Sequence, residues 1–429
     1  MKLDFIDWLK RQNFDSEVIN LFEEASKCYK TQAYHAALLF SYLGFQSIIK
    51  ARILNAQPPK GYKENYWESI QEDLLDDNKW DHVIFESLTR KKPAPIFIIS
   101  DDLRHQIEYW KNRRNDCAHF KDNLINNSHV ESFWVFLRSN LSKLVVNGSR
   151  ESLLNKIVDH FDSSLTSPGS DFQYLVDEIP HAVEVRHLEN FYKDLFQFFK
   201  TLPLFPFDPL PQEAIKFVAR IFELDSDPPV DKLKSYLKND LESLTSLLDY
   251  NPQLIVYFSG NDTFIRKYWY DHIDKSKKVF EILSAMLSHN LIPDGEKKEA
   301  IKHIIKKTGL GTPSKDNHPI LEQFGFFEEF KKIAFEDEKI WSFNWSNSNY
   351  NLVVYYLQNF EIDEVVAKAL SNNFSNDNFP FELRDALNRF FSNNPEKRKK
   401  TAKIIVENKF KKAYKIPALY EEQAEEGSQ

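Results

Sequence analysis

The sequence predicts an almost entirely α-helical protein with more than one domain. Glycine is scarce, at 10 residues in 429, proline reaches only 19, and apolar residues recur at helical spacing along most of the chain. The apolar fraction of 42%, with 36 phenylalanines, can fill substantial cores. Because 429 residues exceed one typical domain, two or three domains are expected.

The first 148 residues read as one helical domain. A short helix is expected over 4–12, followed by a helical segment over 18–29. The next segment, 34–55, is apolar nearly all round, which predicts a buried helix. Further helical segments are expected within 66–90.

A longer helix follows, and Ser100 or Asp101 can cap its first turn. Arg104 is expected among its polar side chains. Its apolar side is formed by Leu103, Ile107 and Trp110.

That helix ends in the most informative stretch of the chain, Arg113-Arg114-Asn115-Asp116-Cys117-Ala118-His119-Phe120. At about 100° per residue, Asn115 and His119 lie one turn apart on one helix face, and the long stem of Arg114 can wrap toward them. An imidazole moves protons near neutral pH, and a guanidinium can hold two phosphate oxygens at once. The combination suits chemistry on a phosphodiester, although a lone pairing of this kind is most often a solvated helix face.

The order of Arg114, Asn115 and His119 at the end of a long helix, after a helical hairpin and before another helix, resembles the HEPN family. The resemblance covers roughly residues 10–148. It implies a helical bundle with metal-independent endoribonuclease activity, with no metal and no cofactor. The family often carries an acidic residue on its second helix, facing the motif. In this sequence Gln46 or a neighbour stands there, which would leave that negative charge absent.

The resemblance also implies roles for the three motif residues. His119 would act as general base on a ribose 2′-OH or as general acid on the leaving 5′-oxygen. Arg114 would stabilise the charge growing on the phosphate, and Asn115 would orient His119 or a phosphate oxygen. The products would be a 2′,3′-cyclic phosphate and a 5′-hydroxyl.

One motif supplies one histidine, whereas two proton transfers are easier with two. HEPN nucleases usually pair two domains, so a homodimer through this domain is expected. The resemblance further implies RNA as substrate, with tRNA among the candidates, a toxin or anti-phage defence role, and an antitoxin or phage-derived trigger as partner. The alternative is a non-catalytic HEPN interaction module or a nucleotide-sensing module in a defence or regulatory complex.

Residues 149–420 read as successive helices interrupted at proline, asparagine and aspartate. This pattern predicts an α-helical array or irregular bundle, with a sub-boundary within 250–320. The segment 191–207 is rich in phenylalanine and is expected to be core. The acidic, polar end, 421–429, is expected to be disordered.

A formal net charge of −8 argues against a generally basic nucleic-acid coat, so RNA contacts would need local basic patches. The strongest basic run begins at Lys397; it could grip an RNA backbone, but such a run is more often a solvated helix face. The candidate RNA-binding residues are Arg113, Lys121, Lys397, Arg398, Lys399 and Lys400.

Other classes of protein find little support. Two cysteines, Cys28 and Cys117, give neither metal-ligand spacing nor a disulfide framework. The N-terminus is too acidic and polar for a signal peptide. No apolar run of about 18 or more residues is recognised, so no membrane span is expected. The cytoplasm is therefore the expected location.

Overall fold

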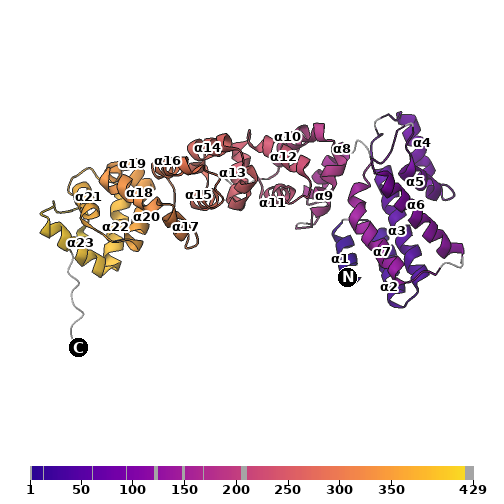
Figure 1. Cartoon of the computed structure of the whole chain (residues 1–429), viewed down its shortest axis with the longest axis horizontal. Helices are drawn as coiled ribbons and strands as arrows, with labels where there is room; N and C mark the ends of the chain where they lie inside the picture. Colours follow the sequence, from indigo (N-terminus) through magenta and orange to yellow (C-terminus); the bar gives the residue numbers. More distant parts are fainter. Residues whose placement is uncertain are drawn as a thin grey trace. The chain divides into compact units, whose positions relative to one another are not determined.

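The described part of this protein is built from α-helices, as the sequence predicts (Figure 1). It contains no strand, and its only bridge of the β type is the isolated antiparallel pair Phe97 and Val146. The structure is a computed structural model that describes residues 2–12, 14–59, 61–92, 94–119, 124–146, 150–167, 169–203 and 210–420.

The chain divides into two compact units, Met1–Tyr236 and Leu237–Gln429. The boundary predicted after residue 148 lies inside the first unit, and the sub-boundary predicted within 250–320 lies inside the second. Both stay predictions. The tail 421–429 lies outside the described residues.

Seven helices make up the N-terminal part of the first unit, and the expected segments all appear among them. They are α1 (Lys2–Arg11), α2 (Ser16–Lys30), α3 (Tyr34–Leu54), α4 (Glu64–Leu75), α5 (Trp80–Thr89), α6 (Asp101–His119) and α7 (Asn127–Asn140).

Helix α3 is the central helix of this bundle and packs against α2, α4, α5, α6 and α7. Among the described residues it is also the one helix long and apolar enough to cross a membrane, a property that the sequence reading overlooked. In this structure 56% of that apolar window is buried inside the protein. Packing on several sides accounts for a helix that is apolar nearly all round.

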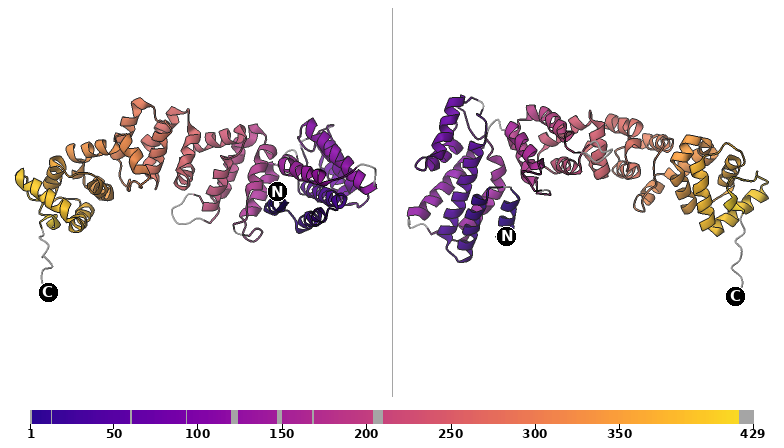
Figure 2. Two further views of the ribbon diagram at one scale, coloured as in Figure 1. Left: turned by 60° about the horizontal axis from the view of Figure 1, so that its bottom comes forward. Right: turned by 180° about the vertical axis from the view of Figure 1, so that it is seen from behind.

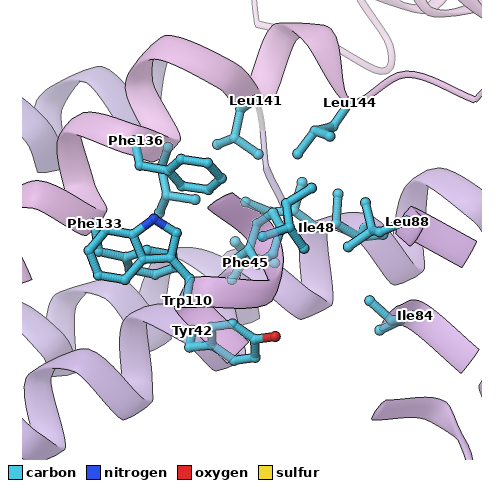
Figure 3. Packing of buried hydrophobic residues seen from close by; sticks show 14 of the residues in the cluster. Tyr42, Phe45, Ile48, Ile84, Leu88, Trp110, Phe133, Phe136, Leu141 and Leu144 are labelled. Carbon is cyan, nitrogen blue, oxygen red and sulfur yellow. The ribbon is translucent and has the colours of Figure 1, made fainter. Parts of the chain in front are cut away.

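The core of the bundle fixes the position of α6. Trp110 lies with its ring 4.9 Å from Phe133 and 6.1 Å from Phe136, both on α7 (Figure 3). Phe45 of α3 meets the Phe133 ring edge-on at 6.2 Å. Full burial of one such side chain contributes roughly 1.5–3 kcal/mol, so this aromatic cluster holds α6 firmly against α3 and α7.

The described residues in the rest of the first unit form five further α-helices. The Phe-rich segment forms core as predicted, because Phe191, Phe196 and Phe199 are fully buried; residues 204–209 lie outside the described part. The helices are α8 (Arg150–Phe161), α9 (Gln173–Ala182), α10 (Leu188–Phe199), α11 (Gln212–Ile221) and α12 (Asp227–Leu237), the last of which ends on the first residue of the second unit.

The second unit is a succession of short helices (Figure 2). Its α-helices are α13 (Leu241–Tyr250), α14 (Asp262–Asp271), α15 (Val279–Ser288), α16 (Asp294–Ile305), α17 (Asn317–Gln323), α18 (Phe326–Lys331), α19 (Phe343–Ser348), α20 (Tyr350–Asn359), α21 (Glu364–Phe374), α22 (Phe381–Asn393) and α23 (Pro395–Glu407). Helices two positions apart pack together, as α14 does with α16, α15 with α17, α20 with α22 and α21 with α23. Such near-neighbour packing is typical of helical arrays, one of the two arrangements that the sequence predicts.

Candidate functional site

Helix α6 begins where the sequence expects it to. The Ser100 hydroxyl accepts a hydrogen bond from the backbone N–H of Leu103 at 3.2 Å, so Ser100 is the residue that caps the first turn. Leu103, Ile107 and Trp110 are buried, and they turn the apolar side of α6 into the core. The opposite end of the helix carries the motif.

Arg104, one of the polar residues of α6, is buried. Its guanidinium donates to the carbonyl oxygens of Leu88 at 3.3 Å and Phe97 at 3.2 Å. A guanidinium can leave water when backbone carbonyls replace the water's hydrogen bonds. Arg104 therefore ties α6 to the end of α5 and to the extended segment between the two helices.

Arg114 lies near the surface but is held on two sides. Its side chain is 21% exposed, and Nη2 lies 3.3 Å from Oδ2 of Asp81 on α5. Nη1 donates to Oδ1 of Asn115 at 3.1 Å. The guanidinium carbon also stands 5.9 Å from the ring centre of Tyr42 on α3. The structure thus brings together two of the three predicted catalytic residues.

Asp81 on α5 places a carboxylate beside Arg114, which the sequence analysis did not anticipate. Gln46 of α3 is fully buried, and its amide nitrogen donates to Oδ1 of Asp81. The three side chains Gln46, Asp81 and Arg114 therefore form a relay from α3 through α5 to α6, which we call the Gln46–Asp81–Arg114 relay. Sequence reasoning missed Asp81, because an acidic residue in the first turn of a helix is ordinary and gives no sign of a partner 33 positions away.

Two aromatic rings and one lysine lie near the Gln46–Asp81–Arg114 relay. Burial, and then the charge of Asp81, raise the pKa of the Tyr42 hydroxyl, while Arg114 lowers it, so this phenol stays neutral in the physiological range. One turn before Arg114, the ammonium of Lys111 stands 3.4 Å from the ring centre of Phe85 on α5. Burial lowers the pKa of Lys111, with Asp81 acting in the opposite direction.

Two other charged residues of the motif, Arg113 and Asp116, pair with each other within α6. Arg113, a candidate RNA-binding residue, pairs through Nη2 with Oδ2 of the buried Asp116 at 2.9 Å. Its guanidinium lies 5.4 Å from the ring centre of Tyr109. Burial raises the pKa of the Cys117 thiol to about 11, so this cysteine is a poor nucleophile near neutral pH.

The backbone of α6 continues through His119, five residues after Arg114. Five helical residues correspond to about 1.4 turns and a rise of about 7.5 Å. The side chain of His119 and the whole of Lys121 lie outside the described part of the structure. The position of the predicted imidazole relative to Arg114 therefore stays a prediction.

No protein-family model, curated protein or solved structure matches this chain. The resemblance to the HEPN family accordingly stays a prediction. It depends on the order of Arg114, Asn115 and His119 at the end of α6.

The basic run on α23 is largely engaged in contacts within the second unit. The Lys397 ammonium donates to the carbonyl oxygens of Leu357, Gln358 and Phe360 at the end of α20. Arg398 is buried. The remaining two candidates, Lys399 and Lys400, are both exposed, and Lys400 pairs with Glu361. These contacts favour a structural role for Lys397 and Arg398, and the predicted RNA contact stays untested.

A cavity of about 190 Å³ lies in the first unit, where the C-terminal half of α3 meets α8 and α9. On its wall the buried carboxylate of Glu178 pairs with Arg52 at 3.4 Å and with Lys156 at 2.9 Å. Burial alone would raise the pKa of Glu178, but Lys156 and Arg52 outweigh it and hold that pKa below its usual range. The lining residues are Gln12, Phe14, Asp15, Val18, Ile48, Ala51, Arg52, Asn55, Ala56, Val145, Val146, Ser152, Lys156, Tyr174 and Glu178.

Proposed function

We propose that this chain is a metal-independent endoribonuclease of the HEPN type that cleaves RNA, with tRNA among the candidate substrates, in the cytoplasm as a toxin or anti-phage effector. The observation that supports the proposal best is that the guanidinium of Arg114 is held in place. Its guanidinium is anchored by Asp81 and Asn115 in the last turns of α6, shortly before His119. An anchored, partly exposed arginine can hold phosphate oxygens while a histidine moves protons, and cleavage of a phosphodiester by 2′-OH attack uses both.

The proposed reaction uses the RNA's own 2′-hydroxyl as the nucleophile. An imidazole takes the 2′-OH proton, the 2′-oxygen forms a bond to phosphorus, and the bond from phosphorus to the 5′-oxygen breaks. The 5′-oxygen leaves with a proton from a second acid. Arg114 offers N–H groups to the phosphate oxygens as their charge grows, and Asn115 keeps one edge of the guanidinium in place.

A second copy of the chain would supply the second proton carrier. Each copy brings one His119, so one imidazole can serve as base and the other as acid when two α6 ends face one phosphate. An antitoxin or a phage-derived trigger would then control access to the shared site.

Cleavage of RNA in the presence of EDTA tests the proposal. We expect the wild-type protein to cut tRNA or total RNA, and Arg114→Ala and His119→Ala each to lower the rate by about 10²–10⁴-fold. His105→Ala is the matched control, because His105 is an exposed histidine on the same helix. Loss of activity in the control, or full activity in both site variants, would contradict the assignment.

The alternative is a non-catalytic HEPN interaction module or a nucleotide-sensing module in a defence or regulatory complex. The cavity beside Arg52 and Lys156 is where the sensing form would bind a ligand. At about 190 Å³ it exceeds the ~150 Å³ cavity that holds benzene in another protein, so it has room for a single-ring group. Calorimetric titration with ATP and GTP tests this alternative. Binding that Lys156→Ala abolishes, together with no RNA cleavage at high protein concentration, would favour the sensor over the nuclease.

A further inference from the structure

We propose that Asp81 is a positioning residue of the RNA-cleavage site, which holds the Arg114 guanidinium in its working orientation and is itself held by Gln46. The inference rests on the proposed function. It assigns a role to a residue of α5 that lies outside the motif on α6.

The two carboxylate oxygens of Asp81 contact different partners. Oδ1 accepts the hydrogen bond from the amide of Gln46, and Oδ2 faces Nη2 of Arg114 at 3.3 Å. Gln46 is fully buried on the central helix α3, so it cannot turn away from the carboxylate without leaving the core. The buried helix thus fixes the carboxylate, and the carboxylate fixes the guanidinium.

This arrangement leaves part of Arg114 available to a phosphate. An arginine carries five N–H groups in a rigid fork. One group on Nη1 is directed to Asn115 and one on Nη2 to Asp81, while the Nε–H is buried without a partner. The second N–H of Nη1 and of Nη2 can then bind two phosphate oxygens, which is the two-pronged contact that arginine makes best.

The negative charge of Asp81 also weakens the binding of an RNA phosphate. It neutralises Arg114, and it lies close enough to repel an incoming phosphate. Replacing the carboxylate with an amide should therefore act in two opposite directions. Binding of RNA should tighten because the repulsion is gone, while turnover should slow because the guanidinium is no longer held in one orientation.

The test compares steady-state RNA cleavage in EDTA by the full-length wild type, Asp81→Asn and Asp81→Asn/Gln46→Glu. For Asp81→Asn we expect kcat to fall by about 10–100-fold and KM to fall rather than rise, with an unchanged melting temperature. In the double variant, the amide introduced at position 81 can donate to the carboxylate introduced at position 46 and accept from Arg114. We therefore expect most of the lost kcat to return.

Asp73→Asn is the matched control, since it removes a carboxylate from an exposed ion pair with Lys79 next to α5. It should behave as the wild type does. Wild-type kinetics in Asp81→Asn, or a loss of kcat that follows a lower melting temperature or that the double variant does not recover, would overturn the inference and leave the proposed function standing. A wild-type protein that cleaves no RNA would instead overturn the proposed function, and the role of Asp81 with it.

Discussion

Arg104 and Arg114 are ten residues apart on α6 and meet opposite environments. Arg104 is buried and donates to two backbone carbonyls, whereas Arg114 is partly exposed and pairs with a carboxylate that is itself 38% exposed. A buried carbonyl left without its donor costs about 1–3 kcal/mol, while a partly exposed ion pair near the surface contributes about 1 kcal/mol or less. We therefore expect Arg104 to contribute mainly to stability and Arg114 mainly to RNA cleavage.

We expect Arg104→Ala to lower the free energy of unfolding by about 1–3 kcal/mol, because the Leu88 carbonyl loses its side-chain donor and the Phe97 carbonyl keeps only the N–H of Ile99. Arg114→Ala should change the free energy of unfolding by about 1 kcal/mol or less, while lowering the rate of RNA cleavage by about 10²–10⁴-fold. Urea denaturation followed by circular dichroism measures both. Equal destabilisation by the two substitutions would mean that Arg114 is a structural residue.

His160 on α8 makes the stability of the first unit sensitive to acid. Its Nδ1 atom is buried without a hydrogen-bond partner among the described residues, and rings of Phe161, Phe172 and Tyr174 surround it. Burial lowers the pKa of His160, although Asp171 and Glu213 act in the opposite direction. The folded protein therefore holds this imidazole neutral at a pH where the unfolded chain, with a pKa of about 6.5, already binds a proton.

Because the unfolded state binds more protons below about pH 6.5, the free energy of unfolding should fall as the pH drops through that value and should recover above it. His160→Phe keeps an aromatic ring among the aromatic neighbours and removes the titration, so its stability should depend less on pH between about 5 and 7. Urea midpoints across that range measure the effect. His181 and His272 also have lowered pKa values through burial, so a residual slope is expected. A steeper slope in the variant would contradict this account.

At the scale of elements, the hairpin of α2 and α3 depends on a glycine. A Cβ atom at Gly44 would lie 2.5 Å from Cε2 of Phe22, and that ring is buried in the core of the bundle. The ring has little room to move, so close contact between the two helices requires the absence of a side chain at this position.

Gly44→Ala should lower the free energy of unfolding by about 1–2 kcal/mol, because overpacking outweighs the helix propensity that alanine adds. Gly295→Ala in α16 is the control, since a Cβ there meets nothing within 4 Å. The control should be neutral or stabilising by up to about 1 kcal/mol. A destabilisation as large in the control as in Gly44→Ala would refute the steric explanation.

Elements that depend on local sequence could be predicted, and contacts between elements could not. Apolar periodicity indicated α3 and α6 closely, and the hydroxyl of Ser100 caps α6 as proposed. The neighbouring residues Arg114 and Asn115 meet as their spacing suggests. The packing of α5 against α6 brings Asp81 to Arg114 and the Leu88 carbonyl to Arg104, and the segment between the two helices adds the Phe97 carbonyl. No local sequence pattern indicates these contacts.

At the scale of the whole molecule, the proposed chemistry requires two copies of the chain. The sequence provides one motif of this kind, and one His119 cannot easily be base and acid in the same turnover. A twofold arrangement of the N-terminal bundle would supply both proton carriers.

We expect sedimentation or light scattering of the purified protein to give twice the mass of one chain under conditions where RNA is cleaved. When the Arg114→Ala and His119→Ala proteins are mixed, exchange of copies forms mixed dimers. The rate of RNA cleavage should then differ from the rates of the two separate variants only if the two copies share one site. An active protein that stays strictly monomeric would contradict the shared site while leaving the role of Arg114 open.

The chemistry of the RNA ends tests the central claim most directly. Purified protein is incubated with tRNA in EDTA, and the termini of the fragments are identified by mass spectrometry. The account predicts 2′,3′-cyclic phosphate and 5′-hydroxyl ends for the wild type and intact RNA for His119→Ala. Intact RNA with the wild type at high concentration, fragments ending in 3′-hydroxyl and 5′-phosphate, or the same fragments with His119→Ala would contradict it.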